Sequence, residues 1–316
     1  MISGDAAVIL NLLIVAILAL LFGIAIACSS SFVSVESWRK FSAEARRSLL
    51  WITVSLPWAF SAGTILLALV TSIFNVTPWL DRLYHWHHNT SFDVISWHSF
   101  LVIIFLALFS TLAIAACYQV VKLSQLQRLL RFMQGNENVL PMQRPIAFTA
   151  GILSPQIFLS SGLVSSLNAD EKNIVFLHEQ AHQRRRDPAK KWVFGFLTAF
   201  YPKLLRLELR REMSLCMEQC ADEAVVATGK AGEYLAKVMV RVSKIMKNSL
   251  TTDISLSLHC RFNGAELTER VHYLVLPQTK KPLPLAWLWP TLISLFVLCL
   301  LQVDVVHHAV ELIFQH

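Results

Sequence analysis

Four long apolar stretches without a single charged residue dominate the hydrophobic pattern of this chain. They span residues 6–27, 49–74, 100–121 and 285–301. A helix of about 22 residues is roughly 33 Å long, which is enough to cross the hydrocarbon core of a bilayer. The last stretch is shorter and contains Pro290, but tryptophans at its start suit a membrane interface. The pattern therefore predicts four transmembrane helices.

The segment between the third and fourth apolar stretches predicts a folded domain with two long helices. Asn168 and Glu171 form the pattern of a capping box, which predicts a helix start at this point. Apolar residues follow at 174–177 and give this helix a buried side. A second helix is expected over residues 203–228, directly after Pro202.

A short hairpin is predicted ahead of these two helices. β-branched and aromatic residues favour strands at 146–151 and 156–160, around a turn at 153–155. Between the two long helices, the apolar segment 192–200 is too short to span a membrane. We therefore expect it to form a buried or membrane-skimming helix.

The composition supports a mainly α integral membrane protein that carries one α+β domain. Hydrophobic residues make up 55% of the 316 residues and charged residues only 16%, which is too apolar for an ordinary soluble domain. We expect three transmembrane helices within residues 1–121, the α+β domain within 122–283, and the fourth transmembrane helix with a short tail within 284–316.

Basic residues are distributed unevenly around the apolar stretches. Those outside the predicted domain are Arg39, Lys40, Arg46, Arg47 and Arg82. Only Arg82 lies in the connection between the second and third stretches. Because Lys and Arg favour the cytosolic side, the pattern predicts a multi-pass membrane protein with both termini outside and the domain in the cytosol. The net charge of +7 then suits anionic lipid head groups, and no nucleic acid is expected as a partner.

The N-terminal stretch is expected to be a retained anchor. The segment before it contains Asp5 and no Lys or Arg, which is unlike a cleaved signal peptide. Cytosolic thiols stay reduced, so the six cysteines are not expected to form a disulfide framework. Cys216 and Cys220 lie one helical turn apart, and without a second such pair they indicate helix packing instead of a metal site.

His178, Glu179 and His182 belong to a His-Glu-Gln-Ala-His motif in the first predicted helix of the domain. At about 100° per residue, the two imidazoles lie on one helix face and can reach a single ion. Glu179 flanks that ion, where a carboxylate can act on a metal-bound water. This spacing is typical of zinc hydrolases.

The second predicted helix carries two carboxylates one turn apart, Glu218 and Asp222. A zinc site with two His ligands commonly takes a carboxylate as its third ligand and leaves the fourth position to water, which favours Glu218. Asp222 is then expected to hold the far ring nitrogen of His178. The alternative is a solvated helix face that exposes Glu212, Glu218 and Glu223.

These residues resemble the membrane metallopeptidases of the beta-lactam sensor-transducer type (BlaR/MecR), a branch of the gluzincins. The likeness covers the order of three spans, a catalytic domain and a fourth span. It also covers the motif at 178–182 with Arg185 and Asp187 after it, the later Glu218 and Asp222, the hairpin at 146–160 and a closing helix at 266–271. The resemblance implies one zinc ion per chain, a gluzincin-like peptidase domain and a location in the inner membrane of a bacterium.

One departure from that family concerns sensing. Its best-known members carry an extracellular penicillin-binding domain after the fourth span, whereas residues 303–316 are too few for a folded domain. The antibiotic-sensing role is therefore not carried over, and a signal would have to arrive through the loop at 75–98 or a membrane partner. The histidines of that loop are expected at an interface and not at a metal site. They are His85, His87, His88 and His98.

The leading hypothesis is a zinc-dependent endopeptidase that cleaves a cytosolic or membrane-proximal protein, with signal transduction implied by the resemblance. A peptide substrate is expected to bind extended beside the strand at 146–151. An oxyanion donor is also required, and His259 is a candidate that the sequence does not place. Two alternatives stay open: a protease for membrane-protein quality control, and a non-catalytic transmembrane scaffold, against which the intact Glu179 argues.

Overall fold

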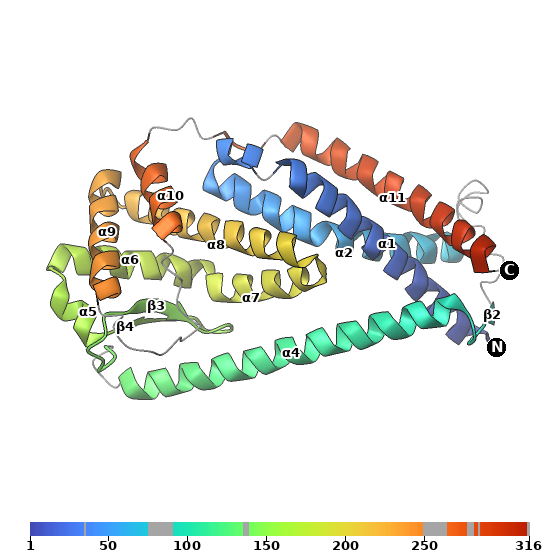
Figure 1. Ribbon diagram of the computed structural model, residues 1–316, viewed down its shortest axis with the longest axis horizontal. Helices are drawn as coiled ribbons and strands as arrows, with labels where there is room; N and C mark the ends of the chain where they lie inside the picture. The colour runs from blue at the N-terminus through green and yellow to red at the C-terminus, as the bar shows by residue number, and fades with distance from the viewer. Residues whose placement is uncertain are drawn as a thin grey trace.

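Long apolar helices form one end of the molecule and a mixed α+β domain forms the other (Figure 1). The computed structural model describes residues 1–34, 36–74, 91–134, 139–248, 264–276, 281–283 and 285–314. The loop histidines at 85, 87 and 88, together with His259 and Cys260, therefore lie outside the described residues.

Three helices are long and apolar enough to cross a membrane: α1 (Asp5–Ser34), α2 (Ala43–Phe74) and α4 (Trp97–Gln134). The three expected N-terminal spans are thus confirmed as long apolar helices. A fourth long helix, α11 (Leu285–Phe314), lies beside α1 (Figure 1). Its apolar part, Leu288–Leu301, is shorter than the other three. The fourth membrane crossing therefore stays a prediction.

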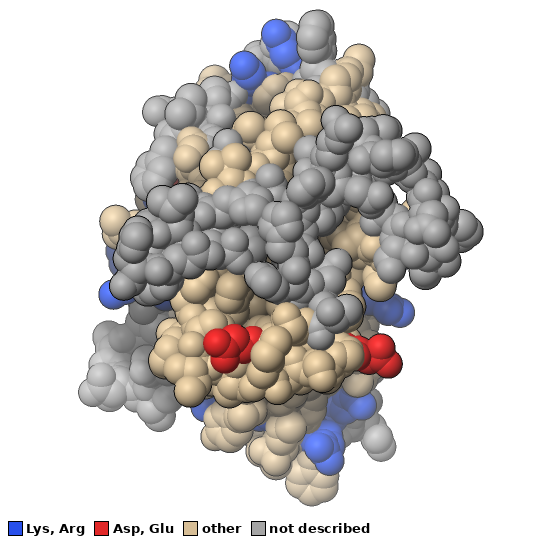
Figure 2. Space-filling view, turned by 90° about the vertical axis from the view of Figure 1, so that its right-hand side faces the viewer, with Lys and Arg blue, Asp and Glu red and all other residues tan. Residues whose placement is uncertain are grey.

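The end of the molecule that carries both termini has little positive charge on its described surface. Figure 2 shows this end, with acidic groups in the foreground and Lys and Arg towards the margins. A two-stranded sheet of β1 (Ile2–Ser3) and β2 (Ser91–Phe92) closes it. The short helix η1 (Glu36–Lys40), which contains Arg39 and Lys40, lies at the opposite ends of α1 and α2. This asymmetry agrees with the predicted orientation, which itself stays a prediction.

α4 runs along one side of the molecule and packs against the rest at a few places (Figure 1). At its outer end Val102 packs with residues of α1. Midway, the ring of Phe109 contacts the rings of Phe196 and Phe200. At its inner end Gln127 donates a hydrogen bond of 2.7 Å to the Ser154 carbonyl. α4 therefore connects the outer end of the molecule to the α+β domain.

The domain begins with the predicted hairpin, which is confirmed. β3 (Ala147–Ala150) and β4 (Gln156–Leu159) pair antiparallel. Gly151 follows β3 with φ +114°, and a Cβ at this position would come within 2.5 Å of the Gln127 amide nitrogen. Only glycine suits both the backbone angle and the close approach of α4.

Six helices complete the described part of the domain. They are α5 (Ser161–Ser166), α6 (Ala169–Arg185), α7 (Asp187–Leu197), α8 (Lys203–Val226), α9 (Gly232–Asn248) and α10 (Gly264–Val275). A 3-10 turn, η3 (Thr198–Phe200), links α7 to α8. α6 starts at the predicted capping box: Asn168 Oδ1 accepts from the Glu171 amide at 2.9 Å, and Glu171 Oε2 accepts from the Asn168 amide at 3.0 Å.

α7 and α8 dock the domain onto α2. Leu205 and Leu209 of α8 form a core with Leu50 and Val54 of α2. Phe194 is buried there and meets the Trp51 ring edge to face at 5.4 Å. The apolar segment 192–200 is therefore the second half of α7 plus η3, packed against a membrane helix.

Candidate metal centre

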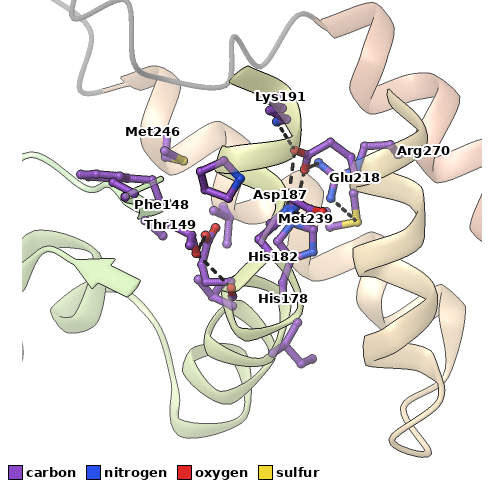
Figure 3. A pocket seen from close by; sticks show the side chains of 18 of the residues that line it. Phe148, Thr149, His178, His182, Asp187, Lys191, Glu218, Met239, Met246 and Arg270 are labelled. Atoms are coloured by element: carbon purple, nitrogen blue, oxygen red, sulfur yellow. Dashed lines mark hydrogen bonds and ion pairs between the residues drawn. The ribbon is translucent and has the colours of Figure 1, made fainter. Parts of the chain in front are cut away.

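His178 and His182 face one another across one turn of α6 (Figure 3). Their Nε2 atoms are 3.2 Å apart. His182 is buried and His178 is partly buried. Because the capping box fixes the start of α6, the motif reaches the middle of a regular helix, where residues four apart share a face.

Glu218 approaches both imidazoles from α8 (Figure 3). Its Oε2 is 3.3 Å from His178 Nε2, and its Oε1 is 3.6 Å from His182 Nε2. Glu218 is only 7% exposed and Glu212 only 8%. The alternative of a solvated carboxylate face on this helix is therefore wrong.

The three side chains fit a tetrahedral zinc ion. Their candidate ligand atoms all lie within 4.8 Å of one another. Ligands bound to tetrahedral zinc at roughly 2.05 Å are about 3.3 Å apart. The two Nε2 atoms are 3.2 Å apart, and each has one oxygen of the Glu218 carboxylate nearby, Oε2 at 3.3 Å from His178 and Oε1 at 3.6 Å from His182. Two imidazole nitrogens and one carboxylate are also a donor set that zinc prefers.

Carboxylates occupy the far side of both imidazoles. Asp222 Oδ1 lies 3.1 Å from His178 Nδ1, and Asp187 Oδ2 lies 2.7 Å from His182 Nδ1. In the neutral imidazole, an Nδ1 that faces an acceptor carries the proton, and the Nε2 lone pair is then left for an ion. Asp222 stands where we expected it. Asp187 received no role from the sequence, since a carboxylate five residues after His182 reaches it only through the left-handed turn at Arg186.

Arg270 of α10 is a further residue that the sequence did not indicate. It is buried and donates to both oxygens of Asp222, at 2.9 and 2.7 Å. Its Nη1 also lies 3.2 Å from Glu218 Oε2. Burial opposes ionisation of Asp222, but Arg270 and His178 outweigh it and lower the pKa of that carboxyl. Burial likewise opposes ionisation of Glu218, yet His182 and Arg270 hold its pKa well below the usual range.

Thr149 of β3 positions Glu179. Its hydroxyl lies 2.8 Å from Glu179 Oε2 and 2.9 Å from the Glu179 carbonyl, and it can donate to one of them at a time. Glu179 is buried, at 9% exposed. The sequence placed the strand correctly but not this contact, because only the packing of the hairpin against α6 creates it.

Comparison with known protein families matches residues 49–274, well over half of the chain, to the family described as BlaR1 peptidase M56. The chain belongs to this family. Comparisons with curated proteins and with solved structures gave no match. M56 membership confirms the resemblance drawn from the sequence, and implies a membrane-associated metallopeptidase. The matched region runs from α2 into α10 and so includes every residue of the metal centre described above.

In this M56 peptidase the candidate centre lies at one side of a cavity of about 400 Å³. Backbone and side chains of 147–152 line one wall, and apolar residues of α9 line another. Lys191 of α7 also lines it, with its Nζ 3.6 Å from Glu218 Oε1 (Figure 3). The cavity therefore offers a strand edge, an apolar wall and a cation around the three metal-ligand candidates.

The cysteines of α8 do not contribute ligands to the candidate centre. Cys216 and Cys220 are both fully buried. Burial raises the pKa of the Cys216 thiol to about 12 and that of the Cys220 thiol to about 11. They are inert packing residues, as expected for two cysteines one turn apart without a second such pair in the sequence.

Proposed function

We propose that this M56 protein is a zinc-dependent endopeptidase of the gluzincin type. The observation that carries the proposal is the convergence of His178, His182 and Glu218 at the spacing of zinc ligands. The carboxylates of Asp222 and Asp187 support it, since they orient the two imidazoles toward one point.

Zinc held by these three residues would lower the pKa of a bound water and polarise a peptide carbonyl. Glu179 is the general base: it takes the proton from that water and returns it to the leaving amine. Thr149 holds the Glu179 carboxylate in place from β3. Lys191 lines the same cavity and supplies a cation for the negative charge that develops on the peptide carbonyl oxygen.

The geometry of β3 favours an extended peptide substrate. β4 occupies one edge of β3, and no other described strand pairs with β3. Residues 147–152 line the cavity beside the candidate metal centre. A peptide that adds as a further strand gains backbone hydrogen bonds with little demand on its side chains. We infer that the substrate is a cytosolic or membrane-proximal protein, cleaved to relay a signal with a membrane partner.

The proposal extends to four transmembrane helices, with both termini outside and the domain in the cytosol. In a cysteine-free background, a membrane-impermeant maleimide should label Val94→Cys from outside intact cells, and should label Arg184→Cys only after lysis. Both native side chains are exposed, so labelling reports the side of the membrane. The reverse pattern would place the domain outside and remove the cytosolic substrate.

Purified protein in detergent tests the chemistry. We expect His178→Ala, His182→Ala and Glu218→Ala each to lose zinc, measured by elemental mass spectrometry. Glu179→Gln should keep zinc and lose about 10²- to 10⁴-fold in hydrolysis. Comparative proteomics of cells with wild type or Glu179→Gln then identifies the substrate. Zinc retained at full stoichiometry in Glu218→Ala would show a different third ligand, and cleavage of many unfolded membrane proteins would favour quality control.

A further inference from the structure

A second cavity of about 640 Å³ lies between α4 and the α7–α8 corner. One wall consists of Leu112, Ala115, Ala116 and Gln119 of α4. The other wall includes Gly195 and Ala199 with the cations Lys191, Arg206 and Arg210. Among the described residues that line it, none is acidic. The cavity is therefore apolar on one side and positively charged on the other.

No carboxylate of the described residues neutralises the two arginines. Arg206 donates to the Ala199 carbonyl at 3.3 Å, and Arg210 donates to Thr198 Oγ1 at 2.8 Å and to the Gly195 carbonyl. Within the part of the chain that the structure describes, no ion pair joins either guanidinium to Asp or Glu. Each has five N–H donors, so donors remain for a ligand.

Several contacts place this cavity at the depth of lipid head groups. Its α4 residues belong to the last turns before Lys122, the first charged residue after the apolar stretch. Tyr201, two residues after Ala199 of the other wall, donates to the Thr53 carbonyl of α2 at 2.9 Å. Thr53 lies about 10 Å along α2 from Arg46 and Arg47. Leu204 and Leu207, close to Arg206 in the chain, are 79% and 55% exposed, so the α7–α8 corner presents apolar side chains to its surroundings.

We propose that this cavity binds one anionic phospholipid, with its phosphate at Arg206 and Arg210 and its acyl chains along α4. Basic pockets between membrane helices on the cytosolic side suit anionic head groups. Long arginine side chains reach head-group depth while their stems stay among apolar groups. The small side chains of Ala115 and Ala116 leave room for an acyl chain. The site shares Gln119, Lys191 and Trp192 with the metal cavity, so the lipid lies next to the proposed centre.

Titration of delipidated protein in detergent with dioleoyl phosphatidylglycerol tests this, followed by native mass spectrometry. We expect one saturable lipid per chain, with dioleoyl phosphatidylcholine bound much more weakly. Each arginine near a phosphate strengthens binding roughly fivefold, so Arg206→Gln with Arg210→Gln should weaken it roughly 30-fold. The matched control, Arg184→Gln with Arg211→Gln, removes the same charge outside the cavity and should bind as wild type.

A second variant pair keeps the arginines. Ala115→Phe fills the apolar wall and should abolish phosphatidylglycerol binding, whereas Cys117→Phe, on another face of the exposed part of α4, should not. The proposal is overturned if the two lipids bind equally, if the control pair weakens binding as much as the arginine pair, or if Ala115→Phe has no effect. Inorganic phosphate that binds as tightly as the lipid would show a free-anion site and overturn it as well.

Discussion

α8 and α4 show opposite relations between sequence and burial. α8 buries thirteen of its 24 residues, among them Glu212, Glu218 and Asp222. α4 carries a long apolar run, yet buries only three of its 38 residues. A soluble protein would be expected to bury α4 and to expose the carboxylates of α8, since burial favours apolar side chains and disfavours carboxylates.

The difference shows that each helix answers to a different environment. The exposed apolar side chains of α4, such as Ile103 and Ile104, require lipid around them. Of the buried carboxylates of α8, Glu218 and Asp222 are stable because cations surround them, chiefly Arg270 and the two imidazoles. A polar helix in the interior thus indicates a functional centre, and an apolar helix at the surface indicates a membrane.

The largest effect is expected where the buried charges of α8 are unbalanced. Arg270→Met leaves Asp222 and Glu218 without their shared cation, and removing one partner of a buried pair costs about 3–5 kcal/mol. Chemical unfolding in detergent measures the loss. Arg211→Met is the control, because its ion pair with Glu269 is exposed and should contribute less than about 1 kcal/mol. Equal stability of the two variants would show that Arg270 does not balance these carboxylates.

The next largest difference is expected in the stability lost when apolar side chains of α8 and α4 are truncated. Leu209→Ala removes a fully buried side chain from the α8 core and should cost about 2–5 kcal/mol. Ile103→Ala removes a side chain that is 63% exposed and should change stability by about 0.5 kcal/mol or less. The same unfolding assay compares them. A large loss for Ile103→Ala would mean that α4 packs against a partner surface.

Asp222→Asn sharpens the role of the buried carboxylates in metal binding. The amide keeps the size of the side chain but weakens the hold on His178 Nδ1, so zinc affinity or activity should fall about 10- to 100-fold. Competition with a fluorescent chelator measures the affinity. Glu223→Gln on the same helix serves as control, since the Glu223 carboxylate accepts a hydrogen bond of 2.6 Å from the Tyr273 hydroxyl. Unchanged affinity in Asp222→Asn would remove Asp222 from the metal centre.

A smaller, graded effect is expected from pH. Burial alone would lower the pKa of His182, but Glu218 and Asp187 raise it to about 10. Below this pKa both ring nitrogens of metal-free His182 carry a proton, and zinc must displace the one on Nε2, so affinity should rise about tenfold per pH unit between about 6.5 and 9. Glu218 and Asp222 have lowered pKa values and stay ionised over this range. Chelator competition at several pH values checks the slope, and a flat profile would mean that the imidazoles are neutral before zinc binds.

Local features of this protein were predictable from sequence, and long-range ones were not. The capping box, the hairpin and the His178–His182 spacing depend on residues close together in the sequence. The periodicity of helices and strands is enough to place such residues relative to one another. Glu218 and Asp222 were predicted because a zinc site with two His ligands commonly has a carboxylate as third ligand, and because the two residues share one helix face. Their approach to the imidazoles depends on how α8 packs beside α6, which the spacing does not contain.

The contacts that sequence missed join residues far apart in the chain. Arg270 lies 48 positions from Asp222, and Thr149 lies 30 positions from Glu179. Many other arginines and threonines had the same local context, so nothing singled these two out. Asp187 is near His182, but only the left-handed backbone at Arg186 turns it back toward the ring. Tertiary packing and one unusual backbone angle supply this information.

The inner end of α4 must keep the same side of the helix turned toward the hairpin. Gln127 and Arg131 contact the hairpin turn at Ser154 because they lie on one side of a helix that continues unbroken from the Phe109 contacts. One residue inserted between positions 110 and 118 would turn this end by about 100°, with the span no less apolar. Both side chains would then face away from the hairpin that carries Thr149. A span of this kind is constrained in register as well as in hydrophobicity, so insertions that leave its membrane crossing intact can still disconnect it from catalysis.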